Sequence, residues 1–206
     1  MAKHYILMGD IISSSLYAPK SLRNSFIHLI SDCNDMFAHD IISPYTITLG
    51  DEFQGIAVNL KTAISSVLYI EEMCLHRELD FKIRYVLSYG NVSTPINRDL
   101  SWGMFGAGLS HARQLLTDKH KKARFIISVR NEKLSRQLGL LFDVLFQIIS
   151  DWKIRDYKLI YDMLTKGDVE VSKTYSKNQS LIWKKRKKFR ILQYREVKEV
   201  ILSLIE

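Results

Sequence analysis

The chain has 206 residues, of which 47% are hydrophobic and 25% are charged, and its formal net charge is +8. This length allows one large or two small domains with a buried core. No apolar run approaches the roughly 20 residues that cross a bilayer, and Gly9 and Asp10 end the N-terminal apolar run too early for a signal peptide. The two cysteines, Cys33 and Cys74, have no metal-binding spacing and cannot form a disulfide framework. We therefore expect a cytoplasmic protein that is not bound to a membrane.

The first 130 residues alternate between β-type and helical patterns. Short apolar, β-prone runs predict strands, and apolar residues spaced three and four apart predict amphipathic helices. The expected strands cover residues 4–9, the two arms of a hairpin within 45–58, 82–89 and 124–129. The expected helices cover residues 20–38, 60–78 and about 109–117. This succession predicts an α+β sandwich with helices on one face of a mainly antiparallel sheet.

Beyond Arg130 the sequence predicts helices only. The helix expected over residues 131–150 is apolar around much of its surface, which predicts packing between domains or between subunits. Further helices are expected at about 152–165, 168–175, 178–190 and 194–205. The change of pattern places a domain at 1–130, a linker or dimerisation helix at 131–150 and a helical domain at 151–206.

Two carboxylates are expected close to the ends of strands. Asp10 follows the first strand, and Asp51 lies with Glu52 at the tip of the hairpin, after Gly50. Mg²⁺ and Mn²⁺ prefer hard oxygen ligands, typically one or two carboxylates together with phosphate oxygens and water. Neighbours on a regular strand point to opposite faces, so Asp51 and Glu52 are not expected to face the same metal. The alternative is that Gly50-Asp51 is only a favourable hairpin turn.

Four segments together resemble the catalytic domain of class III nucleotidyl cyclases. They are Met8-Gly9-Asp10-Ile11, Leu49-Gly50-Asp51-Glu52-Phe53, Arg84 to Gly90, and Phe105-Gly106 with Leu109, Ser110 and Ala112. The resemblance implies a ferredoxin-like βαββαβ core and a homodimer with composite sites. It also implies Mg²⁺ or Mn²⁺ at Asp10 and Asp51, over a nucleotide or another phosphorylated ligand. The residues that it places at the ligand or its phosphates are Ile11, Ser13, Ser14, Gly50, Glu52, Ser110 and Arg113.

The chain departs from the cyclase pattern at the positions that read the base and stabilise the transition state. The base-reading Lys, four residues before the hairpin Asp, is replaced by Ile47. The Asn and Arg of the closing helix are replaced by Ser110 and Gln114, and Arg113 falls one residue early, about 100° around the helix. Loss of such groups costs orders of magnitude in rate, so a competent cyclase is not expected.

Over its whole length the chain resembles the SatD family more closely. The residues that carry this resemblance are Gly9-Asp10-Ile11-Ile12, Gly50-Asp51-Glu52-Phe53-Gln54 and the segment through Ala112-Arg113. The resemblance implies a degenerate cyclase-like domain joined to a C-terminal helix-turn-helix.

Positive charge is concentrated in the last quarter of the chain. Residues 151–206 hold 14 basic and 8 acidic residues, against 16 and 14 in residues 1–150. The segment from Gly167 resembles a helix-turn-helix, with a turn at 176–178 and Asn178 as the cap of the second helix. The residues expected to contact DNA are Asn178, Gln179, Ser180, Trp183, Lys184 and Lys187. Lys185, Arg186, Lys188 and Arg190 are expected near phosphates, and the alternative is a three-helix module without DNA contact.

Three functions follow from these patterns. The main hypothesis is a DNA-binding regulator whose N-terminal domain binds a nucleotide or another phosphorylated ligand. The alternative is a metal-dependent nucleotidyl cyclase or nucleotide-processing enzyme that acts through Asp10 and Asp51. The third is a scaffold without a ligand.

Overall fold

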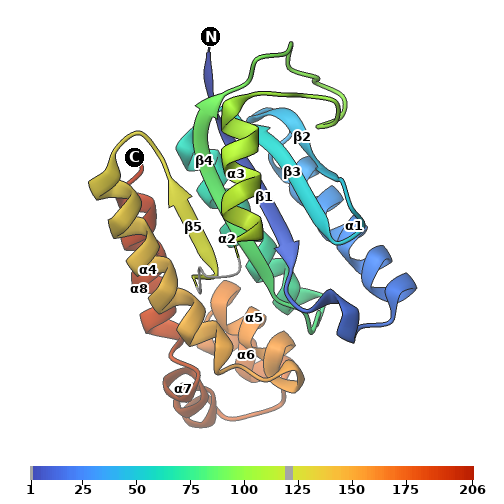
Figure 1. Ribbon diagram of the computed structural model, residues 1–206. Coiled ribbons are helices and arrows are strands. Elements are labelled where there is room, and N and C mark those ends of the chain that lie inside the picture. The colour runs from blue at the N-terminus through green and yellow to red at the C-terminus, as the bar shows by residue number, and fades with distance from the viewer. Residues whose placement is uncertain (1, 119–122) are drawn as a thin grey trace.

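The computed structural model describes residues 2–118 and 123–206, and its centre is one five-stranded sheet (Figure 1). The strands lie in the order β2-β3-β1-β4-β5, and β4 and β5 form the parallel pair among otherwise antiparallel neighbours. Their bounds are β1 (Lys3–Ile11), β2 (Ile41–Ile47), β3 (Glu52–Ala57), β4 (Ile83–Asn91) and β5 (Phe125–Ser128). The predicted α+β class and mainly antiparallel sheet are confirmed.

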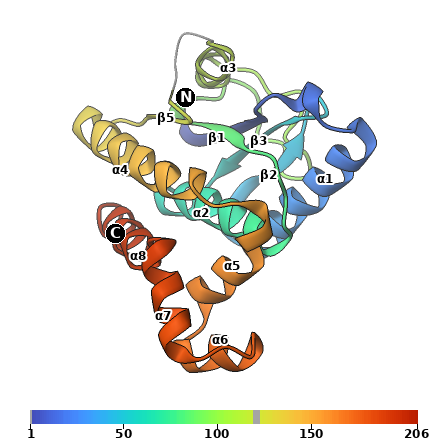
Figure 2. The same ribbon diagram turned by 90° about the horizontal axis from the view of Figure 1, so that it is seen from below.

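Helices cover both faces of the sheet. On one face α1 (Pro19–Met36) and α2 (Leu60–His76) pack against residues such as Leu7 and Ile11 of β1, and on the other α3 (Ala107–Thr117) packs against Ile6 and Met8 (Figures 1 and 2). The expectation of helices on a single face was wrong. Consecutive residues of a strand point to opposite sides, so the apolar run from Ile6 to Met8 needs cover on both faces.

A contact between two glycines lets α3 lie close to β4. A Cβ atom added to Gly108 of α3 would lie 2.6 Å from the carbonyl carbon of Gly90 in β4. A side chain at either position would push the helix away from the sheet.

The chain after residue 130 is helical, as predicted. The 3₁₀ turn η2 (Ile154–Asp156) precedes α5, and α8 lies alongside α4 (Figure 1). The longer elements are α4 (Glu132–Ser150), α5 (Tyr157–Thr165), α6 (Asp168–Thr174), α7 (Gln179–Lys188) and α8 (Ile191–Ser203). The apolar face of α4 packs against β5 and α8. One hydrophobic cluster runs from Leu7 in β1 to Ile201 in α8, so the core is continuous across residue 130.

Polar contacts also join α2 to the helices that follow residue 130. Glu72 of α2 accepts a hydrogen bond from the hydroxyl of Tyr194 in α8 at 3.1 Å and pairs with Lys198 at 2.5 Å. Between α2 and the sheet, buried Glu71 pairs with Arg124 at 2.6 Å and accepts a hydrogen bond from Tyr85 of β4 at 2.8 Å. Cys33 and Cys74 are buried free thiols. In the described part of the chain, no helix combines the length and apolar character needed to cross a membrane.

The end of β1 differs from the sequence prediction. The strand was expected to stop at Gly9, but it continues to Ile11 because Asp10 is paired with Glu52 of β3 on one side and Arg84 of β4 on the other. Asp10 therefore lies inside the sheet rather than beyond the end of a strand.

Candidate metal and phosphate site

Strand alternation brings three charged side chains to the α3 face at one end of the sheet. Asp10 follows Ile6 and Met8 at the two-residue period of β1, and these two belong to the cluster beneath α3. Directly paired residues of antiparallel strands point to the same face. Glu52 and Arg84, the ladder partners of Asp10, therefore share its face.

The carboxyl group of Asp10 is in an acidic environment. Burial, and then the nearby carboxylates of Asp51 and Glu52, raise its pKa to about 6, while Arg84 acts in the opposite direction. Burial, the largest cause, disfavours the charged carboxylate, and the two neighbouring carboxylates add to this effect. A bound cation would relieve this excess of negative charge.

Asp51 lies in the turn between β2 and β3 and is tied to the end of β1. Its Oδ2 atom accepts a hydrogen bond from the hydroxyl of Ser14 at 2.5 Å, and its backbone carbonyl accepts one from the amide of Ile11 at 3.0 Å. Gly50 has a φ of +87°, a conformation that glycine adopts without strain. The hairpin was predicted with both carboxylates at its tip. Asp51 does lie in the turn, whereas Glu52 is the first residue of β3 and is buried.

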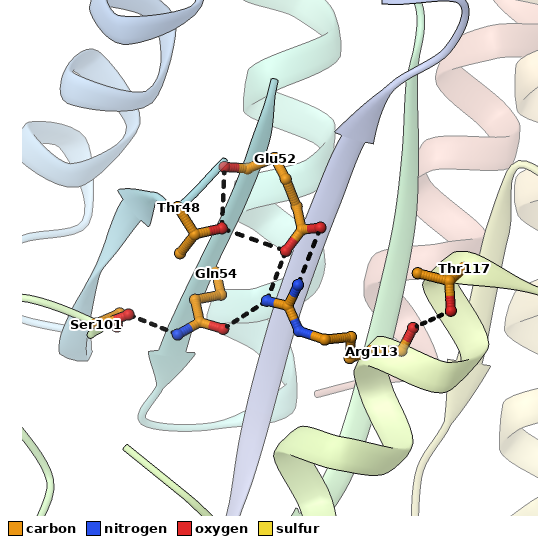
Figure 3. A network of polar contacts seen from close by, with 6 residues as sticks. All are labelled: Thr48, Glu52, Gln54, Ser101, Arg113 and Thr117. Carbon is orange, nitrogen blue, oxygen red and sulfur yellow. Dashed lines mark hydrogen bonds and ion pairs between the residues drawn. The ribbon is translucent and has the colours of Figure 1, made fainter. Parts of the chain in front are cut away.

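Glu52 belongs to a polar network that reaches from Thr48, in the turn after β2, to α3 (Figure 3). Its Oε1 atom lies 2.7 Å from Nη2 of Arg113, and its Oε2 atom accepts from Nη1 at 3.2 Å. The hydroxyl of Thr48 also donates to Oε1, at 3.2 Å. Arg113 further donates to Gln54 at 3.4 Å, and the Gln54 amide donates to the carbonyl of Ser101 at 2.6 Å. Glu52 and Arg113, both predicted at a ligand, thus bind each other.

The sequence prediction missed Gln54 and Ser101 in this network. The signal for Gln54 was its position two residues after Glu52, which places both side chains on the same face of β3. Ser101 lies in the connection between β4 and α3, where no periodic pattern points to a partner.

The remaining predicted ligand residues lie in different surroundings. The side chain of Ile11 is buried in the cluster with α1 and α2, so only its amide faces the turn at Asp51. Ser13 is exposed, with a φ of 57°. Ser110 is exposed on α3, three residues before Arg113 and hence on the same side of the helix. Ile47 is half-buried in β2, where it pairs with Phe53.

The carboxylates of Asp10 and Asp51 suit a hard divalent cation that takes only some of its ligands from the protein. Within residues 2–118 and 123–206, no group of three or more His, Cys, Asp or Glu side chains is arranged to hold a metal ion. Asp10 and Asp51 supply two carboxylates at most, so phosphate oxygens and water would complete the shell, as is usual for Mg²⁺.

The predicted DNA-contacting residues form an exposed surface on α7. Asn178 caps the helix by accepting a hydrogen bond from the amide of Leu181 at 2.9 Å, and Ile182 is buried beneath it. Nζ of Lys187 lies 3.9 Å from the ring centre of Trp183, which is 50% exposed. The exposed predicted residues are Asn178, Gln179, Ser180, Trp183, Lys184 and Lys187.

Two other basic residues of this region are already engaged. Arg186 was expected near phosphates, but it is buried and donates to the carbonyls of Met163 and Lys166 at 2.6 and 2.7 Å. Arg190 pairs with Asp151. The basic face of α7 is therefore narrower than the run of charges in the sequence indicates.

Comparison with known proteins gives a family and a set of distant structures. The sequence model of the SatD family matches residues 4–187, and no curated protein matches the chain. A bacterial light-regulated adenylyl cyclase is 14% identical, with a TM-score of 0.44 over 61% of this chain and 75% of that chain. The catalytic core of a rhodopsin-guanylyl cyclase in complex with ATPalphaS is 17% identical, with a TM-score of 0.39 over 57% of this chain and 72% of that chain.

Proposed function

This chain belongs to the SatD family, and we propose that its sheet domain is a nucleotidyl-cyclase-type module that binds a nucleotide with Mg²⁺ or Mn²⁺ at Asp10 and Asp51. The observation that carries the proposal is that the turn holding Asp51 is bonded to the end of β1 directly after Asp10, through the amide of Ile11 at 3.0 Å from the Asp51 carbonyl. Burial and the neighbouring Asp51 and Glu52 also raise the pKa of Asp10, to about 6. A divalent cation between Asp10 and Asp51 would neutralise this charge and attract phosphate oxygens. The succession β1-α1-β2-β3-α2-β4, with the strand order β2-β3-β1-β4, supports a ferredoxin-like core for this module.

The surroundings of Asp51 also suit a phosphorylated ligand. Ser14 orients one oxygen of Asp51 through its hydroxyl, which leaves the other oxygen for a cation. Gly50 directly precedes Asp51 in an open turn and has no neighbouring atom within 4 Å of an added Cβ. Ser13, the residue before Ser14, is exposed. A phosphate group can therefore approach the turn without displacing a side chain.

Metal-dependent processing of the nucleotide is the catalytic form of this proposal. A metal held by two carboxylates can activate a nucleophile and stabilise phosphoryl transfer. Arg113 is the basic residue of α3, and its charge is balanced by Glu52. We therefore expect the protein to bind the nucleotide but to turn it over slowly. The positive charge that α3 could supply to a transition state is already paired with a protein carboxylate.

Calorimetry of the full chain with ATP and GTP, each with Mg²⁺ or Mn²⁺, tests this proposal. Asp10→Asn and Asp51→Asn are expected to weaken metal-dependent binding at least tenfold, because each removes a charged ligand. Asp143→Asn, on the exposed face of α4, is the matched control and should bind as the wild type does. Chromatography of the same mixtures detects any product. Product that disappears in both site variants identifies an enzyme, and binding without product identifies a sensor. Absence of metal-dependent nucleotide binding in the wild type contradicts the proposal.

Nucleic-acid binding by α7 is a second candidate function, favoured by the exposure of all six predicted contact residues. Asn178 caps α7, and the first residues of this helix are exposed to solvent. Gln179 is one of them, and its side-chain amide can read adenine. Lys184 and Lys187 supply charge for phosphates. In this reading the chain is a DNA-binding regulator, and a homodimer would match two half-sites.

Titration of the full chain with duplex DNA at several salt concentrations tests this candidate. If Z phosphates are contacted, the logarithm of affinity falls with the logarithm of salt at a slope of about −0.9Z. Lys184→Ala with Lys187→Ala should reduce the magnitude of the slope by about 2. The exposed pair Lys61→Ala with Lys133→Ala should leave it unchanged. A wild-type slope near zero contradicts the candidate, and sedimentation of the same samples reports the expected homodimer.

A further inference from the structure

Strand β5 forms one outer edge of the sheet and is paired with β4 alone (Figure 1). In this parallel ladder the amide of Tyr85 donates to the carbonyl of Arg124 at 2.8 Å. Because alternate residues of a strand bond to the same neighbour, the backbone N–H and C=O groups of Phe125 and Ile127 point away from β4. No strand of the described chain pairs with them. This edge can therefore exchange hydrogen bonds with another extended segment.

A groove of about 540 Å³ lies beside this edge, between β5 and the N-terminal half of α4. The half-buried residues Ile127 and Val129 line it on the β5 side. On the α4 side the lining residues Glu132, Arg136 and Gly139 are spaced four and three apart, so they lie along one side of the helix. A volume of this size is in the range of ligand sites.

Two residues of α4 define the open length of the edge. The hydroxyl of Ser135 accepts a hydrogen bond from the amide of Val129 at 3.0 Å, so the edge is closed at that end. Gly139 leaves the groove open, because a Cβ atom added there would have no atom within 4 Å. Glycine inside a helix is less stable than alanine, and the packing of the chain itself does not require it here. The missing side chain leaves room for the backbone of a second segment.

The charges beside the groove are mainly basic. Residues 129–136 hold three basic side chains, Arg130, Lys133 and Arg136, and one acidic side chain, Glu132. All four are exposed, and none of them takes part in an ion pair within residues 2–118 and 123–206. Like charges oppose the pairing of β5 with β5 of a second copy, whereas a segment that carries carboxylates is attracted. Phosphate groups of a nucleic acid only accept hydrogen bonds, so they match the charges but not the carbonyls of the edge.

We propose that the groove between β5 and α4 binds an extended, acidic polypeptide segment of a partner protein, which pairs with β5 as an added strand. Backbone hydrogen bonds to Phe125 and Ile127 hold the segment. One of its apolar side chains fills the space beside Gly139, and one of its carboxylates pairs with Arg136. The proposal does not depend on the metal and phosphate site, because β4 lies between β5 and β1, the strand that holds Asp10.

Amide NMR titration of the full-length chain with the peptide acetyl-Glu-Val-Thr-Val-Glu-amide tests the proposal. We expect saturable binding that shifts the amide signals of Phe125 and Ile127, whereas that of Ile182, in α7, should not move. Lysine in place of both glutamates of the peptide should weaken binding by about tenfold or more. N-methylation of the three central residues, which removes hydrogen-bond donors and keeps the charge, should weaken it as much.

Variants of α4 locate the binding site. Gly139→Leu fills the groove and should weaken binding of the acidic peptide by about tenfold or more. Its melting temperature should not fall, since nothing lies within 4 Å of the added Cβ. Gln147→Leu adds the same side chain at an exposed position further along α4, and it should bind the peptide as the wild type does. Arg136→Glu should reverse the preference, so that the peptide with lysines binds more tightly than the acidic one.

Four results would each overturn the proposal: no saturable binding, signals of Phe125 and Ile127 that do not move, equal affinity for the N-methylated peptide, or unchanged affinity in Gly139→Leu. Self-association of the wild type that Gly139→Leu abolishes, without peptide binding, would instead assign the edge to a second copy of the chain. Binding of oligothymidylate with the same signal shifts, without peptide binding, would assign it to nucleic acid, and either result would also overturn the proposal.

Discussion

Arg113 of α3 reaches across the sheet to Glu52, the first residue of β3, and places Nη2 2.7 Å from the carboxylate Oε1. Along this face of β3, Glu52 lies beside Asp10, Gln54 beside Met8 and Ile56 beside Ile6. The face therefore changes from charged to polar to apolar within five residues. The ion pair stands between the acidic end and the apolar residues of this face, where Glu52 balances the charge of Arg113.

Arg113→Ala is expected to lower the free energy of unfolding by about 2–3 kcal/mol, because it leaves the buried carboxylate of Glu52 without a counter-charge. The loss should be smaller than for a fully buried pair, since the Arg113 side chain is 39% exposed. Urea unfolding measures it. Adding Glu52→Gln should recover part of the loss, and strictly additive effects of the two changes would contradict the coupling.

Asp10→Asn is expected to raise the melting temperature at neutral pH in the absence of divalent metal. The pKa of Asp10 is about 6 in the folded state, against an ordinary value of 3.8 that applies to the unfolded chain. The folded state therefore holds its proton over a pH range in which the unfolded state has released it, and the wild type loses stability as the pH rises from about 4 to about 6. Melting curves from pH 4 to pH 8 should show the two proteins alike at the acid end and separating through pH 6. A difference that is independent of pH would contradict the assignment.

Gly108→Ala is expected to cost about 1–3 kcal/mol, because its new methyl group meets the backbone of Gly90 and neither side can yield. Gly139→Ala is the matched control. Gly139 lies inside α4 with no atom within 4 Å of an added Cβ, so alanine there should stabilise by about 0.5–1 kcal/mol. Chemical denaturation of both variants measures the two effects, which should have opposite signs.

The sequence predicted what depends on local pattern and missed what depends on contacts across the sheet. Strand and helix periods predicted the strands and α-helices, although β2 begins at Ile41, before the hairpin expected within 45–58, and the short 3₁₀ turns gave no pattern. Asn178 was identified as a cap from its residue type alone. The apolar run in β1 did not show that both sheet faces are covered, because a run this short does not reveal whether one or two faces of a strand are buried. The pairing of Arg113 with Glu52 joins residues 61 positions apart, and no spacing rule along one helix or strand predicts it. The burial of Arg186 was missed for the same reason, since its partners lie in the α5 segment.

The buried pair of Glu71 and Arg124 allows the most demanding test of the core. The Glu71 side chain is 4% exposed and Arg124 15%, and Tyr85 donates to the same carboxylate oxygen. Arg124 also lies over the ring of Phe146, 4.2 Å from its centre, which links β5 to α4. Arg124→Ala is therefore expected to destabilise the chain by about 3–5 kcal/mol, because a buried carboxylate loses its counter-charge.

The matched control for this change is Arg155→Ala, which removes an arginine that is 75% exposed and lies 3.8 Å from Asp156. Exposed pairs of this kind contribute at most about 1 kcal/mol. Urea unfolding gives both values, and the reaction of Cys74 with a thiol reagent gives a second readout, since its thiol is buried beside Glu71 and Arg124. Faster labelling of Cys74 in Arg124→Ala than in Arg155→Ala would show that the pair holds α2 and β5 together. Equal stability of the two variants would mean that packing around Phe146 and Tyr85 carries the junction without the ion pair.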